Sequence, residues 1–420
     1  MNYREALSFV HSRQKFGSRP GLDSIRRITE LCNNPQRDMR FIHIAGTNGK
    51  GSVSTMLSNI LIESNKKTGL YISPYVIDFR ERIQINGEMI SKTDFARIIT
   101  FLAPLIERVD SEGLTVTEFE LITCAAFIYF KEKGCDFAVL EVGMGGRLDA
   151  TNIIESPEVS VITRIDFDHT AVLGDTVSQI AHEKCGIIKK AAPTVMYPDQ
   201  YKEAADVVSK TAQLNGSELV IPSTDFSFED NRICGSRVNY KGMEFNLRLI
   251  GAHQRLNAIT AIEAALKIGI LPENIISGIE KTLFAARMEL ISDNPVVLLD
   301  GAHNPNGARA LSSALKDVFG DKKVVAIMGM LADKDVDETL GILAPDFSDI
   351  ITVKVPNPRT MTASELKKVA RKYCPSVTIA DSYNRAIALS RSMAGDSPVI
   401  VCGSLYLASA IRPKLIEFYK

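Results

Sequence analysis

The stretch FIHIAGTNGKGSVSTML, residues 41–57, constrains the fold more than any other part of the sequence. An apolar run of strand length ends in a glycine-rich turn that carries Lys50, and a helical pattern follows. Such a turn lets backbone N–H groups, a helix N-terminus and a lysine converge on phosphate oxygens. The generic pattern G-x-x-x-x-G-K-[ST] is not met, because Ile44 and Gly51 stand where it requires glycine and Ser or Thr. An ordinary turn with an exposed lysine is the alternative, but the flanking elements and the two glycines around Lys50 favour phosphate binding.

Strand and helix patterns alternate on both sides of this turn. Helices around a turn broken at Gly17, Pro20 and Gly21 are expected first, in residues 5–32. The sequence then predicts strands at 40–46, 67–73, 135–143 and 158–165, and helices at 51–64 and 119–134. This alternation predicts a parallel sheet covered by helices on both faces. In residues 216–250, short alternating runs separated by Asp-Asn and Lys-Gly turn signals predict antiparallel hairpins instead.

The last third of the chain returns to the α/β pattern. After a helical stretch at 254–269, LISDNPVVLLD predicts a turn followed by a new strand. Further strands are predicted in KKVVAIMG, DIITVKV, SVTIA and PVIVCG, with helices between them. We therefore expect a domain boundary near residues 292–295, which divides the chain into domains 1–294 and 295–420.

Charge and cysteine usage exclude several classes of protein. The 49 Lys and Arg residues balance 50 Asp and Glu residues, which argues against nucleic-acid or membrane-surface binding by bulk charge. The N-terminal residues contain no apolar run of signal-peptide length, and no segment approaches a membrane span. Seven scattered cysteines without a C-x-x-C pair predict reduced thiols in a cytoplasmic protein and do not favour a zinc site.

Polar residues stand directly after several predicted strands, where open α/β sheets place their ligands. Glu141 ends an apolar strand and is a candidate magnesium ligand, although a helix cap or a salt bridge would explain it as well. His169 follows the next strand and joins the same sheet edge if the strands are neighbours, but a single histidine is more often structural. Asp300, His303 and Asn304 form a polar turn that indicates a ligand site or, alternatively, an Asx-turn that caps a helix.

Two further features are ambiguous by themselves. The run that begins at Gly143 reads G-M-G-G-R-L, so Leu148 occupies the place of the last glycine of a dinucleotide-binding motif. Lys184, in the helical stretch IAHEKCG, is by default a solvated lysine, but close to metal and phosphate it could take part in chemistry.

Taken together, these stretches resemble one family. HIAGTNGKGS, YISPYV, TEFELITCAAFIYF, VLEVGMGGRLDATN, FDHTAVLGDT, IAHEKCGIIK, GAHQRLNA, LDGAHNP and GSLYLASA are similar, in order, to the motifs of folylpolyglutamate synthases. These enzymes include the bifunctional dihydrofolate synthases and belong to the Mur ligase superfamily. The resemblance runs from the first helix almost to the C-terminus. The family's phosphate loop is G-T-N-G-K-G-S, which accounts for the additional glycine.

The resemblance implies a role for many residues of this chain. The phosphate loop would contact ATP through Gly46, Thr47, Asn48, Gly49, Lys50, Gly51 and Ser52. Asn257, Arg287 and Asp300 match further ATP-binding positions, and Ser73, Glu141 and His169 match magnesium ligands. The pterin-bearing substrate would lie near the SRPGL loop and Thr117, Glu118, Phe119, Glu120, Leu148, Asp149 and Ala150. His303 and Ser404 would lie near the incoming glutamate. Lys184 matches a lysine that is carbamylated in the family, and Lys50, His169 and Lys184 are the implied catalytic residues.

The implied fold is α/β: an N-terminal P-loop-type ATPase domain, with a mainly parallel and a small antiparallel sheet, and a C-terminal Rossmann-like domain. The implied reaction joins L-glutamate to a folate carboxylate activated by ATP as an acyl phosphate. The implied cofactors are ATP, two magnesium ions, a CO₂-derived carbamate on Lys184 and a monovalent cation. We expect a cytoplasmic monomer that binds neither nucleic acid nor membrane.

Two departures from the family pattern affect substrate contacts rather than the chemistry. SPYV has a tyrosine where many members carry His or Phe, and RIDFDHT differs from the commoner I-G-L-D-H-T. The sequence leaves open whether dihydropteroate is also a substrate. A nucleotide-gated binding protein without ligase activity is an alternative from another class. A Mur-type ligase acting on a cell-wall precursor is a closer alternative, but LDATN and TEFE favour a folate.

Overall fold

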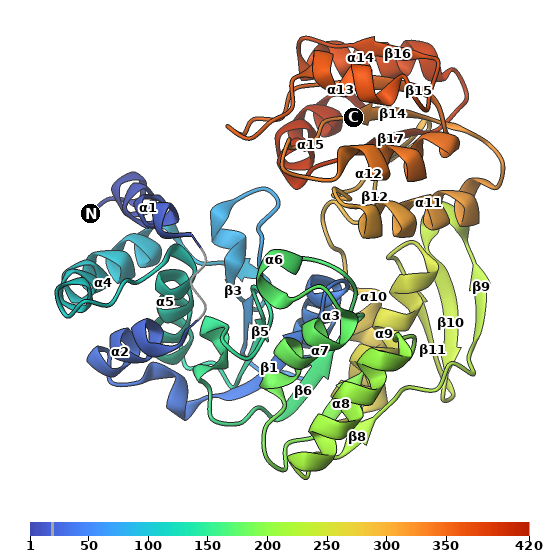
Figure 1. Cartoon of the computed structure of the whole chain (residues 1–420). Coiled ribbons are helices and arrows are strands. Elements are labelled where there is room, and N and C mark those ends of the chain that lie inside the picture. The colour runs from blue at the N-terminus through green and yellow to red at the C-terminus, as the bar shows by residue number, and fades with distance from the viewer. Residues whose placement is uncertain (18–20, 420) are drawn as a thin grey trace. The chain divides into compact units, whose positions relative to one another are not determined.

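The computed structural model describes residues 1–17 and 21–419, and its chain divides into two compact units (Figure 1). The first unit contains residues 1–226, 240–245 and 256–281. The second contains residues 227–239, 246–255 and 282–420. Each unit is built around its own sheet.

The sheet of the first unit has, within the described residues, eight strands in the order β4-β3-β2-β5-β1-β6-β7-β8. Their bounds are β1 Arg40–Ala45, β2 Thr68–Tyr71, β3 Ile83–Ile85, β4 Glu88–Met89, β5 Phe137–Glu141, β6 Val159–Ile162, β7 Thr194–Met196 and β8 Leu219–Val220. From β2 to β8 the neighbours run parallel, whereas β3 and β4 form an antiparallel edge. β1 and β5 therefore end side by side at the centre of the sheet.

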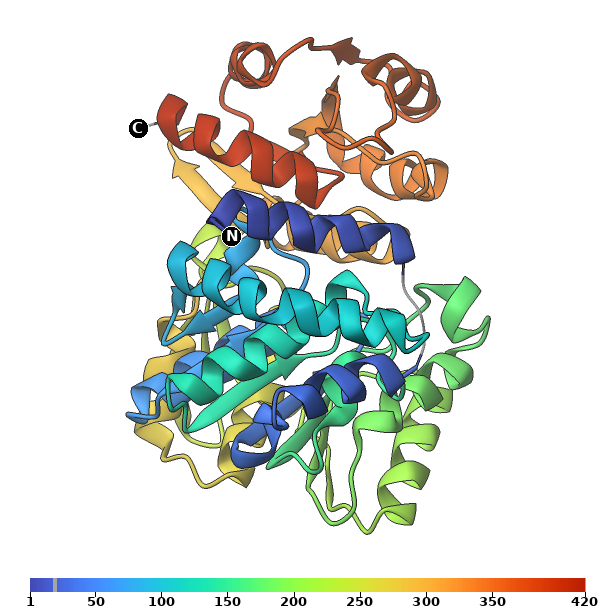
Figure 2. The same cartoon turned by 90° about the vertical axis from the view of Figure 1, so that its left-hand side faces the viewer.

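Helices cover both faces of this sheet. One face carries α1 Tyr3–Ser12, α2 Asp23–Leu31, α4 Lys92–Ser111 and α5 Glu118–Glu132, which share one core cluster with Phe41, Tyr71 and Leu140 (Figure 2). On the other face α3 Lys50–Glu63 packs against β1, β2 and β5, and α10 Pro272–Glu280 packs on α3. The remaining helices of this unit are α6 Thr170–Leu173, α7 Val177–Lys184, α8 Lys202–Leu214 and most of α9 Ala252–Lys267.

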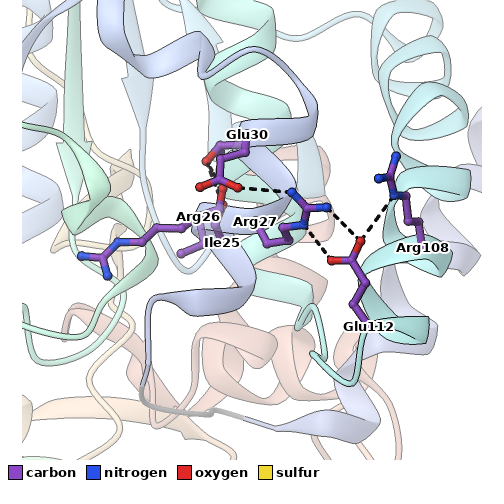
Figure 3. Close-up of polar contacts among 7 residues, drawn as sticks. Ile25, Arg26, Arg27, Glu30, Arg108 and Glu112 are labelled. Atoms are coloured by element: carbon purple, nitrogen blue, oxygen red, sulfur yellow. Dashed lines mark hydrogen bonds and ion pairs between the residues drawn. The ribbon is translucent and has the colours of Figure 1, made fainter.

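Ion pairs fix the helices of the first face to one another. The guanidinium of Arg27 on α2 contacts the Glu112 carboxylate at 2.7 and 2.9 Å and also reaches Glu30 on its own helix (Figure 3). Arg108 of α4 approaches the same Glu112 carboxylate, whereas the side chain of Arg26 points away from this network (Figure 3).

The hairpin region is mainly as the sequence predicts, with one difference. β9 Ser227–Asp230, β10 Ser236–Tyr240 and β11 Met243–Leu247 form a sheet in the order β11-β10-β9, and β9 pairs with β10 antiparallel. Leu219–Val220, however, pairs parallel with β7 as β8 and extends the large sheet. The preceding helix α8 returns the chain to that edge, so the strand completes a crossover rather than a hairpin.

The sheet of the second unit has, within the described residues, six strands in the order β12-β13-β17-β14-β15-β16. Their bounds are β12 Glu289–Asp293, β13 Val296–Leu299, β14 Val324–Met328, β15 Phe347–Thr352, β16 Val377–Ile379 and β17 Val399–Cys402. All neighbours are parallel except β12 and β13. The helices are α11 Pro305–Phe319, α12 Val336–Leu343, α13 Ala363–Ala370, α14 Tyr383–Ala394 and α15 Leu405–Tyr419.

The start of this second sheet differs from the sequence-based expectation of a turn followed by one strand. Residues 289–293 are themselves a strand, β12, which pairs with β13 across the turn at Asn294 and Pro295. The expected boundary at 292–295 thus falls within a hairpin of the C-terminal sheet. The pattern of this strand is weak because each of its residues is either exposed or only partly buried.

None of the helices within residues 1–17 and 21–419 combines the length and the apolar character that crossing a membrane requires.

Candidate functional site

The glycine-rich turn after β1 leads directly into α3, as the sequence predicts for a phosphate loop. The loop is held from behind by the chain that follows β6. Thr47 and Asn48 donate their N–H groups to the Arg164 carbonyl, and the Thr47 hydroxyl donates to the Asp166 carbonyl at 2.9 Å. The first N–H groups of α3, from Lys50 onward, have no carbonyl partner within the helix because they lie in its first turn. They are available to an anion.

Two glycines of this loop are required by close approach of other side chains. A Cβ on Gly46 would lie 1.8 Å from the Thr163 Oγ1, and one on Gly49 would lie 2.5 Å from the Asn257 Oδ1. Gly49 also has φ +87°, a left-handed conformation that side chains rarely adopt. This contact brings Asn257 of α9, which is distant in the sequence, to the phosphate loop.

Two lysines converge on one carbonyl of the loop. Lys50 Nζ donates to the Gly46 carbonyl at 3.0 Å, and Lys184 Nζ, at the end of α7, donates to the same oxygen at 2.9 Å. Lys184 is only 3% exposed. Burial, together with the nearby charge of Lys50, lowers the pKa of Lys184 to about 7. A substantial fraction of this amine is therefore neutral, and nucleophilic, near neutral pH.

The second glycine-rich turn, after β5, lies beside the first. Val142, Gly143, Met144 and Gly145 line the same small pocket as Gly46, Thr47, Lys50, Asp168, His169 and Lys184. Asp149 holds this turn: its Oδ2 accepts the N–H groups of Gly143 and Met144, both at 3.0 Å. A Cβ on Gly143 would lie 2.5 Å from the Phe119 ring, so the turn packs directly on the start of α5.

The four residues predicted to contact folate at the start of α5 differ in what they do. Thr117 and Glu120 form a capping box at the start of α5. The Thr117 N–H and hydroxyl donate to the Glu120 carboxylate at 2.8 and 2.7 Å. Glu118 approaches His11 Nδ1 at 3.3 Å and the Arg82 guanidinium at 3.7 Å. Phe119 packs on Gly143, beside the turn.

The three predicted magnesium ligands follow strands of the large sheet. Ser73, after β2, meets Glu141 at the end of β5, whereas His169 comes after β6. Glu141 is 4% exposed at the end of β5, and its Oε2 accepts the Ser73 N–H at 3.1 Å. His169 immediately precedes α6 in a left-handed conformation, φ 49°, and its Nε2 lies 3.9 Å from Asp168 Oδ2. No cluster of three or more His, Cys, Asp or Glu side chains suited to a metal is found in residues 1–17 and 21–419. Magnesium commonly needs only one or two carboxylates, because waters and phosphate oxygens complete its shell.

The second unit has a polar cluster of its own at the ends of β13 and β17. Burial raises the pKa of Asp300, while the Arg287 charge and the N–H groups of Met288 and Ala302 oppose that rise. Those two N–H groups donate to the Asp300 carboxylate at 2.8 and 2.7 Å. His303 Nδ1 lies 2.9 Å from the Gly301 carbonyl. Asn304 caps α11, so it fulfils the alternative role of an Asx-type cap.

Ser404 is the other predicted residue of this cluster. It follows β17, the neighbour of β13, and is 2% exposed. Its hydroxyl oxygen accepts the Tyr406 N–H at 3.1 Å. A Cβ on Gly301 would lie 2.2 Å from Leu405 and 2.7 Å from Arg287 Nη1, so the segments that carry Arg287, Asp300 and Ser404 are in contact.

Some predicted positions stand apart from these clusters. Leu148 is partly buried and Ala150 is buried beside Asp149, but neither lines the pocket. The SRPGL loop includes residues 18–20, which lie outside the described residues. Sequence reasoning did not single out Met144 and Gly145 as pocket residues, although the glycine run after a strand was a usable signal.

A larger hollow, of about 410 Å³, lies at the opposite end of β1 from the phosphate loop. Arg26, Gln36 and Phe41 are among its lining residues, and none of the residues predicted to bind ATP, metal or folate belongs to it. The chemistry that the sequence predicts therefore belongs to the smaller pocket at the carboxyl ends of the strands, where parallel sheets bind ligands.

Comparison with known proteins agrees with this geometry. Residues 44–265 match the Mur ligase middle domain, and residues 286–405 match the Mur ligase glutamate ligase domain. The folylpolyglutamate synthase of Lacticaseibacillus casei is 35% identical over 99% of both chains. The dihydrofolate synthase/folylpolyglutamate synthase of Bacillus subtilis is 33% identical over 98% of this chain and 99% of that protein.

A solved structure, the FPGS-AMPPCP-folate complex, superimposes with a TM-score of 0.84 at 35% identity, over 99% of this chain and all of that one. The predicted α/β fold is thereby confirmed. With matches to both Mur ligase domains and relatives aligned over nearly its whole length, the chain belongs to the folylpolyglutamate and dihydrofolate synthase family of Mur ligases.

Proposed function

We propose that this protein is an ATP-dependent ligase that adds L-glutamate to the γ-carboxylate of a folate through an acyl phosphate. The observation that carries the proposal is the pocket at the ends of β1 and β5, where Lys50, Lys184 and His169 line one site. A pocket that holds the Lys50 ammonium beside the first N–H groups of α3 suits the binding and transfer of a phosphoryl group. The folate and nucleotide named in the FPGS-AMPPCP-folate complex support the choice of substrates.

ATP binding is assigned to the residues of the phosphate loop, Gly46 to Ser52, with Asn257 behind them. Lys50 balances phosphate charge, and the N–H groups at the start of α3 hold phosphate oxygens. Arg287 and Asp300, which lie together in the second unit, are proposed as further ATP-binding residues. Two functional domains are proposed, as the sequence predicts, with β12 in the C-terminal one because this strand pairs with β13.

Magnesium is assigned to Ser73, Glu141 and His169, and two ions are proposed. The Glu141 carboxylate fits such an ion because it stands at the end of β5, the neighbour of β1, and carboxylate oxygens are ligands that magnesium prefers. Bound magnesium would neutralise phosphate charge. Lys184 is proposed to carry a carbamate from CO₂, which its lowered pKa favours because only the neutral amine reacts. A monovalent cation is proposed as a further ligand of the same site.

Once the folate carboxylate is phosphorylated, the glutamate amine attacks and phosphate leaves. His303 and Ser404 are assigned to the incoming glutamate, and Phe119, with the 143–149 turn, to the folate. Glu118, Leu148 and Ala150 complete the proposed folate contacts. Asp149 holds the turn beside them, and Thr117 and Glu120 fix the helix that carries Phe119. Exclusion of water protects the acyl phosphate from hydrolysis. A cytoplasmic monomer is proposed, without nucleic-acid or membrane partners.

The test is a product assay with purified protein, ATP, L-glutamate and either tetrahydrofolate or dihydropteroate. Glutamylated tetrahydrofolate, with one ADP and one phosphate per bond, is the expected result. Dihydrofolate from dihydropteroate would add the second activity, which the name of the Bacillus subtilis relative favours. ATP hydrolysis without either product would overturn the ligase proposal and favour a nucleotide-gated binding protein.

The carbamate is tested separately with Lys184→Ala. This variant should lose most activity, and formate or acetate should restore part of it by filling the vacated space. Mass spectrometry of trapped wild-type protein should find the carbamate on Lys184. Full activity of the alanine variant would exclude a catalytic role for this lysine.

A further inference from the structure

A buried histidine lies beneath the proposed site and has no part in the mechanism above. His43, in the middle of β1, is 0% exposed, and its Nε2 lies 2.8 Å from the Thr151 hydroxyl, which is also fully buried. The Thr151 hydroxyl in turn donates to Asp149 Oδ1 at 2.6 Å. Three buried side chains therefore form one hydrogen-bonded row from the centre of the sheet to the turn that lines the pocket.

The directions of these hydrogen bonds follow from a count of donors. Asp149 accepts four: from the N–H groups of Gly143 and Met144 at Oδ2, and from the N–H and hydroxyl of Thr151 at Oδ1. Four donors occupy the four acceptor positions of an ionised carboxylate. They favour the charged form of Asp149 and partly offset burial, which raises the pKa of this carboxyl above its usual value.

The Thr151 hydroxyl has a single proton, which goes to Asp149, so it can only accept from His43. His43 must therefore carry its proton on Nε2. Its Nδ1 is buried without a hydrogen-bond partner in the described residues, which suits a nitrogen that has no proton to donate. Burial and the charge of Lys189 lower the pKa of His43 to about 3, so the ring stays neutral near pH 7.

We infer that His43 is a positioning residue of the ligase site, which acts through Thr151 and Asp149 on the Gly143–Met144 turn. Asp149, with its acceptor positions filled by the chain, serves to hold the turn in place. The turn lies between Phe119, against Gly143, and Lys184, whose carbonyl and Cα would lie 2.8 and 3.0 Å from a Cβ on Gly146. A small displacement of the turn therefore disturbs the folate side and the Lys184 side of the pocket together.

The inference rests on the proposed function, and the experiment uses full-length protein with ATP, glutamate and tetrahydrofolate. Thr151→Val keeps the shape of the side chain but removes both hydrogen bonds, and His43→Phe removes the donor alone. Each should lower kcat about tenfold, because a charge-assisted bond that fixes the turn is weakened. KM for ATP should change less than about threefold, because the 46–52 loop is held by other contacts.

Two comparisons separate positioning from a general loss of stability. His43→Gln places an N–H close to that of Nε2 and should recover most of the kcat lost in His43→Phe. The kcat of the double variant His43→Phe/Thr151→Val should be no lower than that of the worse single variant, because both substitutions interrupt the same series of hydrogen bonds. Thr68→Val is the matched control: Thr68 is fully buried in β2, and its hydroxyl donates to the Lys66 carbonyl. It should leave kcat unchanged.

A measurement that does not depend on enzymatic activity completes the test. Nitrogen-15 NMR of histidine-labelled protein should show His43 neutral with its proton on Nε2, and His43→Gln identifies that signal. A proton on Nδ1, additive losses in the double variant, or no rescue by His43→Gln would each overturn the inference. Failure of the wild type to make any glutamylated product would instead overturn the proposed function and leave the NMR result standing.

Discussion

Two glycine-rich turns follow neighbouring parallel strands in this protein, and they are built in opposite ways. The turn after β1 is held from behind by Arg164 and Asp166, and the first N–H groups of α3 are left for a ligand. The turn after β5 contains its own anion, because Asp149 accepts the N–H groups of Gly143 and Met144. A turn that must bind phosphate keeps its donors free, whereas a turn that shapes a pocket wall uses them internally.

The open turn should be the more sensitive to loss of charge. Lys50→Ala should reduce turnover by at least ~100-fold, the scale of losing one preorganised electrostatic contact. Folding should survive, because Lys50 is only partly buried. Steady-state kinetics and a thermal melt check this, with Lys210→Ala, an exposed lysine on α8, as the control. Near-normal synthesis by Lys50→Ala would mean that the phosphate assignment is wrong.

Lys184, which touches both turns, should make stability depend on pH. Its folded pKa, about 7, lies below its ordinary value of 10.5, so the folded state is favoured above 10.5 and loses stability as pH falls toward 7. In CO₂-free buffer, Lys184→Met should therefore gain stability relative to wild type as pH falls. The difference in unfolding free energy between Lys184→Met and wild type should change by at most ~1.4 kcal/mol per pH unit. Urea unfolding at pH 7 and 9.5 measures it, and a gap independent of pH would contradict the burial of an unmodified lysine.

An alanine substitution in each turn should raise the KM for a different substrate. Gly49→Ala meets Asn257 and a left-handed backbone, and should raise KM for ATP about tenfold, whereas Gly143→Ala meets Phe119 and should raise KM for folate instead. Gly113→Ala is the control for strain alone, because Gly113 has φ +85° with open space around it. If both site variants raised the same KM, the two turns would not have distinct roles.

The smallest effect is expected at the helix that supports the closed turn. Thr117→Ala removes the cap of α5 and leaves Glu120 without its side-chain partner, which should cost about 1 kcal/mol of stability. The KM for folate should rise less than in Gly143→Ala, because Phe119 keeps its place in the core. Urea unfolding and folate titration measure the two quantities. A rise in KM larger than that of Gly143→Ala would indicate direct contact between Thr117 and the substrate.

The sequence by itself determined the elements and the identity of the first turn. Continuous apolar runs such as FIHIA and FAVLE predict buried strands, and the glycines around Lys50 predict the phosphate loop, because these signals are local in the chain. The family motifs extended this to the domain types. The strand β12 was missed because a half-exposed strand has no strong pattern.

Only the tertiary structure decided which residues meet. Asn257 reaches Gly49, Lys184 and Lys50 share the Gly46 carbonyl, and His43 reaches Thr151 across 108 positions. None of these contacts has a periodic signal, since each depends on strand order and helix packing rather than on neighbours in sequence. The pKa of Lys184 also depends on the tertiary structure. In the sequence it is an ordinary lysine, and only burial beside the Lys50 cation lowers its pKa enough for the neutral amine to react.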